Sequence, residues 1–401
     1  MPSIFSAVEL APRDPILGLT EAFNTDTRPG KVNLGVGVYY NEHGKIPLLE
    51  CVRAAERERV QASAARGYLP IEGPAAYAAP VQRLLLGADS EAIASGRAVT
   101  AEALGGTGGL RIGADLIRRL SPGATALISE PSWENHRALF EAAGFKVGTY
   151  PYYDPATHGL DFPAMMAALE RAEPGTVVVL HACCHNPTGV DPDPQQWGRI
   201  VECLRQRQLV PFLDIAYQGF GEGLEPDAAP VRMVAAAGID ALVASSFSKS
   251  FSLYGERVGA LTLLTASRDA GQRVMSQLKR VIRANYSNPP THGAALVSAV
   301  LASAELRAQW EAELGAMRER IRSMRGLLVD GLARRGVKTD FGFVRRQRGM
   351  FSYSGLTTAQ VDRLREQHAI YAVGTGRICV AALNSGNIDA VCDAIAAVLK
   401  S

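Results

Sequence analysis

The amino-acid sequence predicts an α/β protein in which helices cover both faces of a largely parallel sheet. From about residue 100 to residue 265, short apolar runs alternate with helical segments, as in successive strand–helix–strand units. The apolar runs are continuous rather than alternating, which is typical of strands buried on both sides. With 401 residues, the chain can bury a large core and fill one to three domains.

Five of the apolar runs are predicted to be strands. They cover residues 124–130, 176–184, 209–217, 241–248 and 259–265. Helices are predicted between them over Pro131–Gly144 and over Pro194–Gln206. The second helix opens with a proline, which is favoured in the first helical turn.

The last third of the chain predicts a second, smaller α/β unit. Residues 294–335 form a very long helical pattern that we expect to be broken or bent once. A helix at 358–367 and a final helix from Ile388 follow. The expected organisation is an N-terminal arm and part of the small domain (1–46), a large domain (47–300), and a long connecting helix with the small domain (301–401).

Composition and charge argue against several classes of protein. Hydrophobic residues make up 47% of the chain and charged residues 20%, as in ordinary globular proteins. A formal charge of +2 gives no electrostatic reason to bind nucleic acid or an acidic membrane surface. No apolar run is long enough to span a bilayer, and the first residues lack a secretory-signal pattern. We therefore expect a cytoplasmic protein with no nucleic-acid or membrane partner.

The six cysteines predict neither disulfides nor a metal site. Cys183 and Cys184 are adjacent, which fits no disulfide framework. His181 and His185 flank this pair, but no further Cys or His lies nearby to complete a structural metal site. Buried, reduced thiols and no bound metal are expected.

Lys249 stands in a run of serines between two predicted core strands. The stretch 241–264 reads ALVASSFSKSFSLYGERVGALTLL, and Arg257 follows the lysine by eight residues. Taken alone, it fits a solvated turn as well as it fits an anion cradle holding a reactive amine. The residues at the ends of the other strands decide between these interpretations.

Polar residues also come after the other strands, at the sheet edge where open α/β folds bind ligands. Asp214 and Tyr217 come after one strand, and Asn186 comes after another. The stretch GGTGGLRIGADLIRRL (105–120) puts Gly106 and Thr107 at the start of an amphipathic helix, which favours a phosphate. It is not a dinucleotide fingerprint, because the sixth position of that register is an arginine rather than a glycine.

Together these residues meet the chemical needs of pyridoxal 5′-phosphate. Its phosphate requires an arginine, hydroxyls and a helix N-terminus, for which the candidates are Arg257, Ser246, Ser248 and Thr107. Asp214 can pair with the ring nitrogen, and Tyr217 and Asn186 can donate to the ring oxygen. Lys249 would hold the cofactor covalently, because nearby cations and partial burial help an amine to lose its proton.

Nine motifs, in order, resemble the aspartate and aromatic aminotransferases, the class I, fold-type I aminotransferase family. They are VNLGVGVY (32–39), YLPIEG (68–73), GGTGGLRIGAD (105–115), PSWENH (131–136), HACCHNPTG (181–189), DIAYQGFG (214–221), SFSKSFSLYGERVG (246–259), IRANYSNPP (282–290) and GRICVAAL (376–383). The resemblance runs nearly end to end. It implies a large domain with a mostly parallel seven-stranded sheet and a smaller α/β domain.

The resemblance also implies a homodimer whose two sites are shared between subunits. Tyr68 would reach the neighbour's phosphate and Arg283 the neighbour's substrate. Trp133 would stack on the cofactor ring, Gly37 would lie over the substrate, and Arg377 would clamp the substrate α-carboxylate. The implied substrate-binding set is Gly37, Trp133, Asn186, Arg283 and Arg377. The implied catalytic set is Lys249, Asp214, Tyr217 and Trp133, with Lys249 as the base that moves the substrate proton.

Other positions in these motifs carry weaker predictions. His136 and His181 are expected near the ring, with structural histidines as the alternative. The family usually has Gly or Pro at the position of Ala182, a change that puts nothing catalytic in doubt. We expect a cis peptide bond at Asn186-Pro187, to aim Asn186 at the ring, and Glu130-Pro131 is the second candidate.

The expected reaction moves an amino group between an aromatic amino acid (Phe or Tyr, and also Asp) and 2-oxoglutarate in a ping-pong cycle. Segments 134–154, 214–228, 252–259 and 348–384 are more similar to the aromatic enzymes than to the aspartate-specific ones. An aspartate aminotransferase with narrow dicarboxylate specificity is the alternative. Arg283 does not separate the two, because an aromatic enzyme must still accept 2-oxoglutarate.

Two other classes of protein, a dehydrogenase and a pyridoxal-binding regulator, would account for fewer of the candidate site residues. A dehydrogenase would need the missing glycine fingerprint and leaves Lys249 unexplained. A catalytically silent pyridoxal-binding regulator has no need of Arg377 and Arg283 together.

Overall fold

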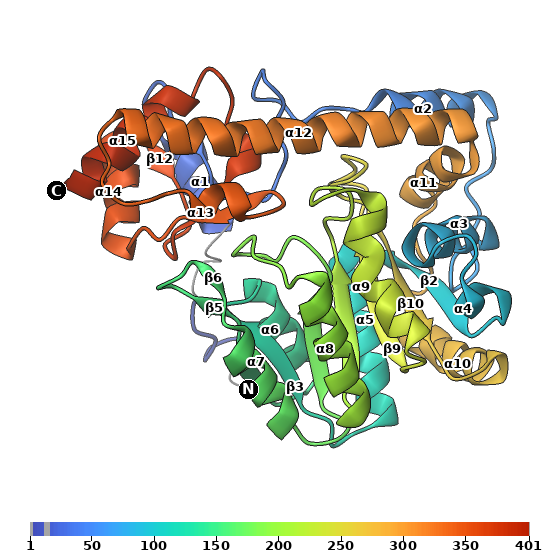
Figure 1. The fold of residues 1–401 in the computed structure, drawn as a ribbon. Helices are drawn as coiled ribbons and strands as arrows, with labels where there is room; N and C mark the ends of the chain where they lie inside the picture. Colours follow the sequence, from blue (N-terminus) through green and yellow to red (C-terminus); the bar gives the residue numbers. More distant parts are fainter. Residues whose placement is uncertain (1–2, 12–16, 401) are drawn as a thin grey trace.

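A seven-stranded sheet lies at the centre of the computed structural model, which describes residues 3–11 and 17–400 (Figure 1). The strand order is β2-β10-β9-β8-β7-β3-β4. These strands are β2 (Ala98–Leu104), β3 (Ala126–Glu130), β4 (Val147–Pro151), β7 (Val177–His181), β8 (Val210–Ile215), β9 (Ala241–Ser246) and β10 (Val258–Leu264). All neighbours run parallel except β10, which is antiparallel to β2 and β9. The predicted α/β class and largely parallel sheet are confirmed.

The five predicted strands are present, and four of them end one to three residues earlier than expected, whereas β3 ends at residue 130 as predicted. Strand β7 stops at His181, because the chain then turns through Cys184, whose φ of 52° is left-handed. Two strands, β2 and β4, were not among those predicted from their residues. Strand β2 carries Glu102 and β4 carries Gly148 and Pro151, and these residue types are depleted in strands.

Helices cover both faces of the sheet and bury two separate apolar cores. Neighbouring residues of one strand point to opposite cores: Phe212 and Leu242 belong to one, Leu213 and Val243 to the other. The first core is closed by α5 (Gly105–Leu120), α6 (Glu134–Ala142) and α10 (Arg268–Asn285). The second is closed by α7 (Phe162–Arg171), α8 (Pro194–Gln206) and α9 (Leu224–Ala236).

Two predicted helices, α8 and α6, begin after different local features: a capping box and a cis peptide bond. Helix α8 has the predicted bounds, because Asp193 and Gln196 form a capping box in front of its opening proline. Helix α6 starts at Glu134, three residues later than predicted, after the cis Glu130-Pro131 bond. The Asn186-Pro187 bond is also cis, so both predicted cis bonds are confirmed.

The long helical pattern is broken once, as predicted, into α11 (His292–Ala302) and α12 (Ala304–Arg334). Ser303 lies at the break with extended backbone, and its hydroxyl accepts a hydrogen bond from the Leu306 amide at 3.2 Å. Helix α12 runs along one side of the whole molecule, from α2 (Glu50–Gln61) to α15 (Ile388–Lys400) (Figure 1). It thereby connects the sheet region to the C-terminal unit.

The C-terminal unit contains short strand pairs and takes in part of the N-terminal segment. Strand β1 (Val32–Asn33) pairs in parallel with β12 (Ile370–Tyr371), and β11 (Phe351–Tyr353) pairs antiparallel with β13 (Arg377–Cys379). Its helices are α13 (Phe343–Arg346), α14 (Thr358–His368), the 3-10 turn η1 (Val380–Ala382) and α15. The domain boundaries near residues 46 and 300 stay a prediction.

Five further elements complete the described chain, and one of them, the helix over residues 75–86, packs against the sheet and α9. They are α1 (Leu17–Thr25), α3 (Ala75–Leu86), α4 (Glu91–Ala94), β5 (Tyr153–Asp154) and β6 (Gly159–Leu160). None of the helices within the described ranges is both long and apolar enough to cross a bilayer. All six cysteines are free and buried, as predicted.

Replacing Gly259 by alanine should destabilise the junction between β10 and the start of α5. A methyl group there would lie 2.6 Å from the carbonyl carbon of Gly105 and from the carbonyl oxygen of Ser245, and these backbone atoms cannot move aside cheaply. We expect Gly259→Ala to cost about 1–3 kcal/mol of unfolding free energy and to lower Tm by a few degrees in calorimetry.

Gly326→Ala is the matched control. Gly326 lies inside α12, and a methyl group there meets no atom within 4 Å. Alanine favours a helix interior over glycine by about 0.5–1 kcal/mol, so this variant should melt at the same or a higher temperature. Equal melting of Gly259→Ala and the native protein would contradict the close packing.

Candidate active site

A cavity of about 200 Å³ lies beyond the carboxyl ends of β7, β8 and β9. It is lined by Gly37, Gly106, Thr107, Trp133, His181, Asn186, Asp214, Ala216, Tyr217, Ser246, Ser248, Lys249, Arg257, Phe351 and Arg377. Every site residue predicted from the sequence is among them except Tyr68 and Arg283. Residues from the sheet, from α5 and from the C-terminal unit therefore converge on one space.

One end of the cavity is built to hold an anion. The Arg257 guanidinium donates to the Leu104 carbonyl at 3.3 Å, at the start of α5, and to the Ser248 hydroxyl at 3.4 Å. It can approach this helix end because position 105 is glycine: a Cβ there would lie 2.5 Å from Arg257 Nη2. No carboxylate of the described residues lies within 4 Å of Arg257. A guanidinium beside a helix N-terminus and serine hydroxyls is a suitable phosphate site.

Lys249 provides an amine next to this anion-binding end. Its Nζ lies 4.9 Å from the centre of the Tyr217 ring. Burial lowers the pKa of Lys249, and the charge of Arg257 lowers it further, while Asp214 opposes the shift. A lowered pKa increases the share of neutral amine, which is the nucleophilic form. Burial also raises the pKa of Tyr217, so its phenol stays protonated and can donate a hydrogen bond.

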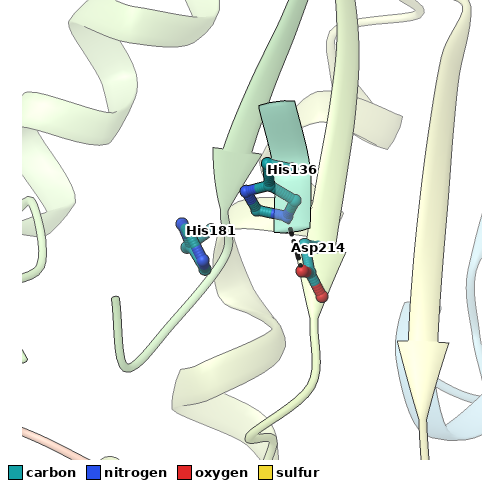
Figure 2. A group of neighbouring side chains, drawn as sticks. All are labelled: His136, His181 and Asp214. Atoms are coloured by element: carbon teal, nitrogen blue, oxygen red, sulfur yellow. Dashed lines mark hydrogen bonds and ion pairs between the residues drawn. The ribbon is translucent and has the colours of Figure 1, made fainter. Parts of the chain in front are cut away.

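Asp214 and His136 form a hydrogen-bonded pair at the other end of the cavity (Figure 2). Asp214 Oδ2 lies 3.0 Å from His136 Nε2, and His136 Nδ1 lies 3.0 Å from the Ser132 hydroxyl. Burial alone would raise the pKa of Asp214, but the hydrogen bond and charge of His136, with the charges of His181 and Lys249, lower it. Asp214 therefore remains a carboxylate.

The second oxygen of Asp214 is the clearest sign of a missing ligand. Asp214 Oδ1 is buried and has no hydrogen-bond partner among the described residues. A buried carboxylate oxygen without a donor is costly, so a ligand N–H would be strongly favoured there. The phosphate-binding end, the nearby amine and this free oxygen together fit pyridoxal phosphate.

His136 and His181 lie beside Asp214 on neighbouring elements, α6 and β7 (Figure 2). Their ring centres are 4.9 Å apart. Burial, followed by the neighbouring His136, lowers the pKa of His181 to about 3, so His181 is neutral at physiological pH. These two histidines and Asp214 are close enough to bind a metal ion, but Asp214 Oδ2 is already engaged by His136. The absence of a metal stays a prediction.

Arg377 enters the cavity from the C-terminal unit. It is 1% exposed and donates to Asn186 Oδ1 at 3.0 Å and to the Gly35 carbonyl at 2.8 Å. Its Nε is buried without a hydrogen-bond partner among the described residues, and its closest carboxylate there, Glu134, is 3.9 Å away. This guanidinium therefore has both charge and a donor available for a substrate carboxylate.

Phe351 lines the cavity, although the sequence analysis did not predict it as a site residue. Its ring packs under the guanidinium of Arg377, with the two centres 4.4 Å apart. A Cβ at position 37 would lie 2.7 Å from the Phe351 ring, so the ring requires glycine there. Phe351 sits in the stretch GMFSYSGL (349–356), and an aromatic residue in a short apolar strand looks the same whether it packs in a core or lines a site.

Tyr68 and Arg283 lie together on the surface instead. Tyr68 is 95% exposed. Arg283, at the end of α10, donates to Ser287 and, at 3.5 Å, to Asn288. Asn288 in turn donates to the Leu69 carbonyl at 2.7 Å, which joins the two segments. The two residues that sequence reasoning assigned to a neighbouring subunit are thus the two that a single chain leaves out of the cavity.

Comparison with known proteins agrees with this geometry. The family model for class I and II aminotransferases matches residues 29–395. The chain is 64% identical to an aspartate aminotransferase of Pseudomonas aeruginosa and 49% identical to the aromatic-amino-acid aminotransferase of Escherichia coli, covering 99% of this chain and 100% of each relative.

Solved structures show the same relationship. An aromatic-amino-acid aminotransferase from Burkholderia pseudomallei, covalently bound to pyridoxal phosphate, is 69% identical with a TM-score of 0.97. An aromatic aminotransferase from Psychrobacter sp. B6, crystallised with aspartic acid, is 43% identical with a TM-score of 0.97. Both alignments cover 99% of this chain and 100% of the other. The chain belongs to the class I and II aminotransferase family and is a pyridoxal-phosphate-dependent transaminase.

Proposed function

We propose that this transaminase moves the amino group of phenylalanine, tyrosine and aspartate to 2-oxoglutarate in a ping-pong cycle. The observation that carries the proposal is one cavity holding the Lys249 amine, the free oxygen of Asp214 and the incompletely paired Arg377. Relatives named for aromatic amino acids and for aspartate are both similar to this chain. An aspartate aminotransferase with narrow specificity is the alternative, favoured by the name of the 64% identical relative.

Cofactor binding is assigned to the two ends of the cavity. Arg257, with Ser246, Ser248 and the first turn of α5, would hold the phosphate, and Asp214 Oδ1 would accept the ring N–H. Pyridoxal phosphate, when bound, supplies an aldehyde carbon and an electron-accepting ring. His136 orients the Asp214 carboxylate and helps keep it ionised, so that the ring nitrogen stays protonated. Tyr217 would donate to the ring oxygen.

Proton transfer is assigned to Lys249 and substrate positioning to Arg377. The Lys249 amine, with its lowered pKa, can both bond to the aldehyde and later carry the proton to and from the substrate Cα. Arg377 and Asn186 would fix the α-carboxylate, and the narrow space around Gly37 and Phe351 would limit how the substrate lies. The same residues serve both half-reactions, because amino acid and oxo acid share the carboxylate.

A homodimer is proposed to complete each site. Tyr68 and Arg283 are exposed in the single chain, although the family resemblance assigns them to the phosphate and to the substrate side chain. The single chain also exposes large apolar side chains. Among them are Leu48 (50% exposed) and Val60 (72% exposed), which line one surface groove. Exposed apolar surface of this kind is typical of an interface. A cytoplasmic location is also proposed, since six free thiols suit a reducing compartment.

Dual specificity is proposed to depend on the mobility of Arg283. A dicarboxylate needs its distal charge paired, whereas an aromatic ring beside a buried, unpaired arginine would be unfavourable. Arg283 is exposed, and its guanidinium donates hydrogen bonds to the side chains of Ser287 and Asn288. Such a side chain can pair with aspartate and turn towards water when a ring enters.

The Lys249→Ala variant should still bind pyridoxal phosphate non-covalently, through Arg257 and Asp214, but lose essentially all turnover. In the native protein, borohydride should fix the cofactor to Lys249, as read by peptide mass spectrometry. Lys279→Ala, which alters a surface lysine paired with Glu72, should keep full activity and labelling. A label on any other lysine would refute the assignment.

The Asp214→Asn variant should lower kcat by roughly two to four powers of ten. The reason is that the ring N–H loses its charged partner, and removing one member of a buried charge pair costs about 3–5 kcal/mol. Asp269→Asn, in a surface ion pair on α10, should leave kcat unchanged. Near-native kcat in Asp214→Asn would show that the ring nitrogen is held by another group.

The Arg283→Leu variant should lower kcat/KM for aspartate and 2-oxoglutarate, with a loss of about 2–4 kcal/mol of transition-state stabilisation. The rate of the phenylalanine half-reaction should change by less than about tenfold. Single-turnover kinetics with each substrate measures both effects. Arg273→Leu, another exposed arginine of α10, is the matched control. If native protein reacts thousands of times more slowly with phenylalanine than with aspartate, the narrow aspartate specificity is correct.

The shared site gives this experiment a second arm. Mixed dimers of Lys249→Ala and Arg283→Leu chains contain one site with a native lysine and a native arginine, so mixing should restore aspartate turnover. If mixed dimers form without any gain, Arg283 does not act on its neighbour's substrate.

A further inference from the structure

A second cavity, of about 420 Å³, is lined mainly by arginines and shares no residue with the active site. It lies between α12, the loop at 220–222 that comes after β8, and the segment 345–349 at the end of α13. Helices α12 and α13 lie side by side (Figure 1). Its charged lining consists of Arg318, Arg322, Arg325, Arg345, Arg346 and Arg348, with Glu222 as the one acidic residue.

The carboxylates around this arginine cavity do not pair with all of its guanidinium groups. Glu222 pairs with Arg322 at 2.7 Å and with Arg348 at 3.1 Å, and Glu319 pairs with Arg322 at 3.0 Å and with Arg318 at 3.5 Å. Arg345 pairs with Asp330 from outside the cavity. In the described chain, neither Arg325 nor Arg346 has a carboxylate within 4 Å. The cavity therefore concentrates positive charge beyond what the protein neutralises locally.

Arg325 is a buried guanidinium without a carboxylate partner, and it is the strongest observation in favour of a bound anion. It is 2% exposed, and within the described residues it donates only to backbone carbonyls: Val344 at 3.2 Å, Gly349 at 2.8 Å and Phe351 at 2.5 Å. Burial lowers its pKa to about 10, which reflects the cost of a buried guanidinium without a counter-charge. An anion in the cavity would remove part of that cost.

Arg318 adds an unused donor. One of its nitrogens, Nη1, donates to the Gly219 carbonyl at 2.9 Å, and Glu319 lies 3.5 Å from Nε. Nevertheless Nε is buried and makes no hydrogen bond within the described part of the chain. A bound oxyanion could accept from it.

Two buried carboxylates, Asp191 and Asp227, lie near this region, and the charge of Arg348 acts on Asp191, but neither carboxylate forms an ion pair with an arginine of the described chain. The oxygens of Asp227 accept the amides of Gly219, Gly221 and Glu222. Those of Asp191 accept the amides of Cys184 and His185. Both carboxylates thus serve to hold backbone loops.

The geometry points to an anion site at the arginine cavity, for a small molecule that carries two or more carboxylate or phosphate groups. Guanidinium groups bind both kinds of oxyanion through paired hydrogen bonds, and several arginines from separate segments favour a multivalent ligand. The volume is in the range of small-molecule sites. Such a ligand would lie beside the backbone of Phe351, which Arg325 holds and whose ring lines the active site.

Calorimetric titration of the cofactor-saturated enzyme tests this inference, with pyrophosphate as the phosphate probe and citrate as the carboxylate probe. At about 0.1 M salt, where weak surface attraction is screened, at least one probe should bind saturably at one site per chain. The probe that binds, pyrophosphate or citrate, identifies the class of ligand. Absence of saturable binding of either probe at millimolar concentration would overturn the proposal.

Two variants locate the site. Arg346 is exposed and has no ion pair in the described chain, so Arg346→Ala should fold normally, while Arg318→Ala removes the unused donor. Each should weaken binding about tenfold or more, which is the typical effect of one charged hydrogen bond. Arg205→Ala, in an exposed ion pair on α8, should bind as the native enzyme does. Undiminished binding in both cavity variants would place the anion elsewhere and refute the site.

Discussion

The hydrogen bond between His136 and Asp214 is the interaction on which the rest of the active site depends. A carboxylate buried at the end of a central strand would normally take up a proton, because burial disfavours its charge. His136 prevents this, and it leaves the second oxygen of Asp214 free and unpaired within the described chain. The cavity thus has a fixed negative charge at one end, where a protonated ring nitrogen can bind.

The opposite end depends on how closely helix α5 approaches β9 and β10. Glycines at 105 and 259 allow the start of α5, the Ser245 carbonyl and the Arg257 guanidinium to come together. The result is a positive end, suited to an anion, in the same cavity as the negative Asp214. Burial lowers the pKa of Lys249, and the two ends act on it in opposite directions: Asp214 raises this pKa and Arg257 lowers it. The balance favours a reactive amine.

The C-terminal unit contributes Phe351 and Arg377 to the cavity, where Arg377 is proposed to bind the substrate carboxylate. Pairing of β11 with β13 places Phe351 and Arg377 next to each other, and Arg377 then reaches Asn186 across from the sheet. Arg325 of α12 holds the carbonyl of Phe351 from behind. The same helix therefore supports the strand that carries Phe351 and lines the arginine cavity, so a ligand in that cavity would adjoin a backbone segment of the active-site cavity.

Features encoded by local pattern could be predicted from the residues alone. Continuous apolar runs predict buried parallel strands, and the opening proline predicts the start of α8 at residue 194, whereas the position of the break at Ser303 was not predicted. Lys249, Asp214 and Arg257 could be identified because each lies near the end of a strand, and strand ends meet at one edge of such a sheet. Strands β2 and β4 escaped prediction, since they owe their pairing to neighbours rather than to their own composition.

Features that depend on contacts between distant segments emerged only from the folded chain. The role of Phe351 comes from its packing against Arg377 and Gly37, which nothing in its own stretch encodes. The surface positions of Tyr68 and Arg283 are tied to an Asn288 contact across more than two hundred residues. The arginine cavity is assembled from three separate segments, and the loop at 220–222 is about a hundred residues from the lining residues of α12. Charges form a site only where folding gathers more of one sign than the neighbouring groups neutralise, and that balance is a property of the packed chain.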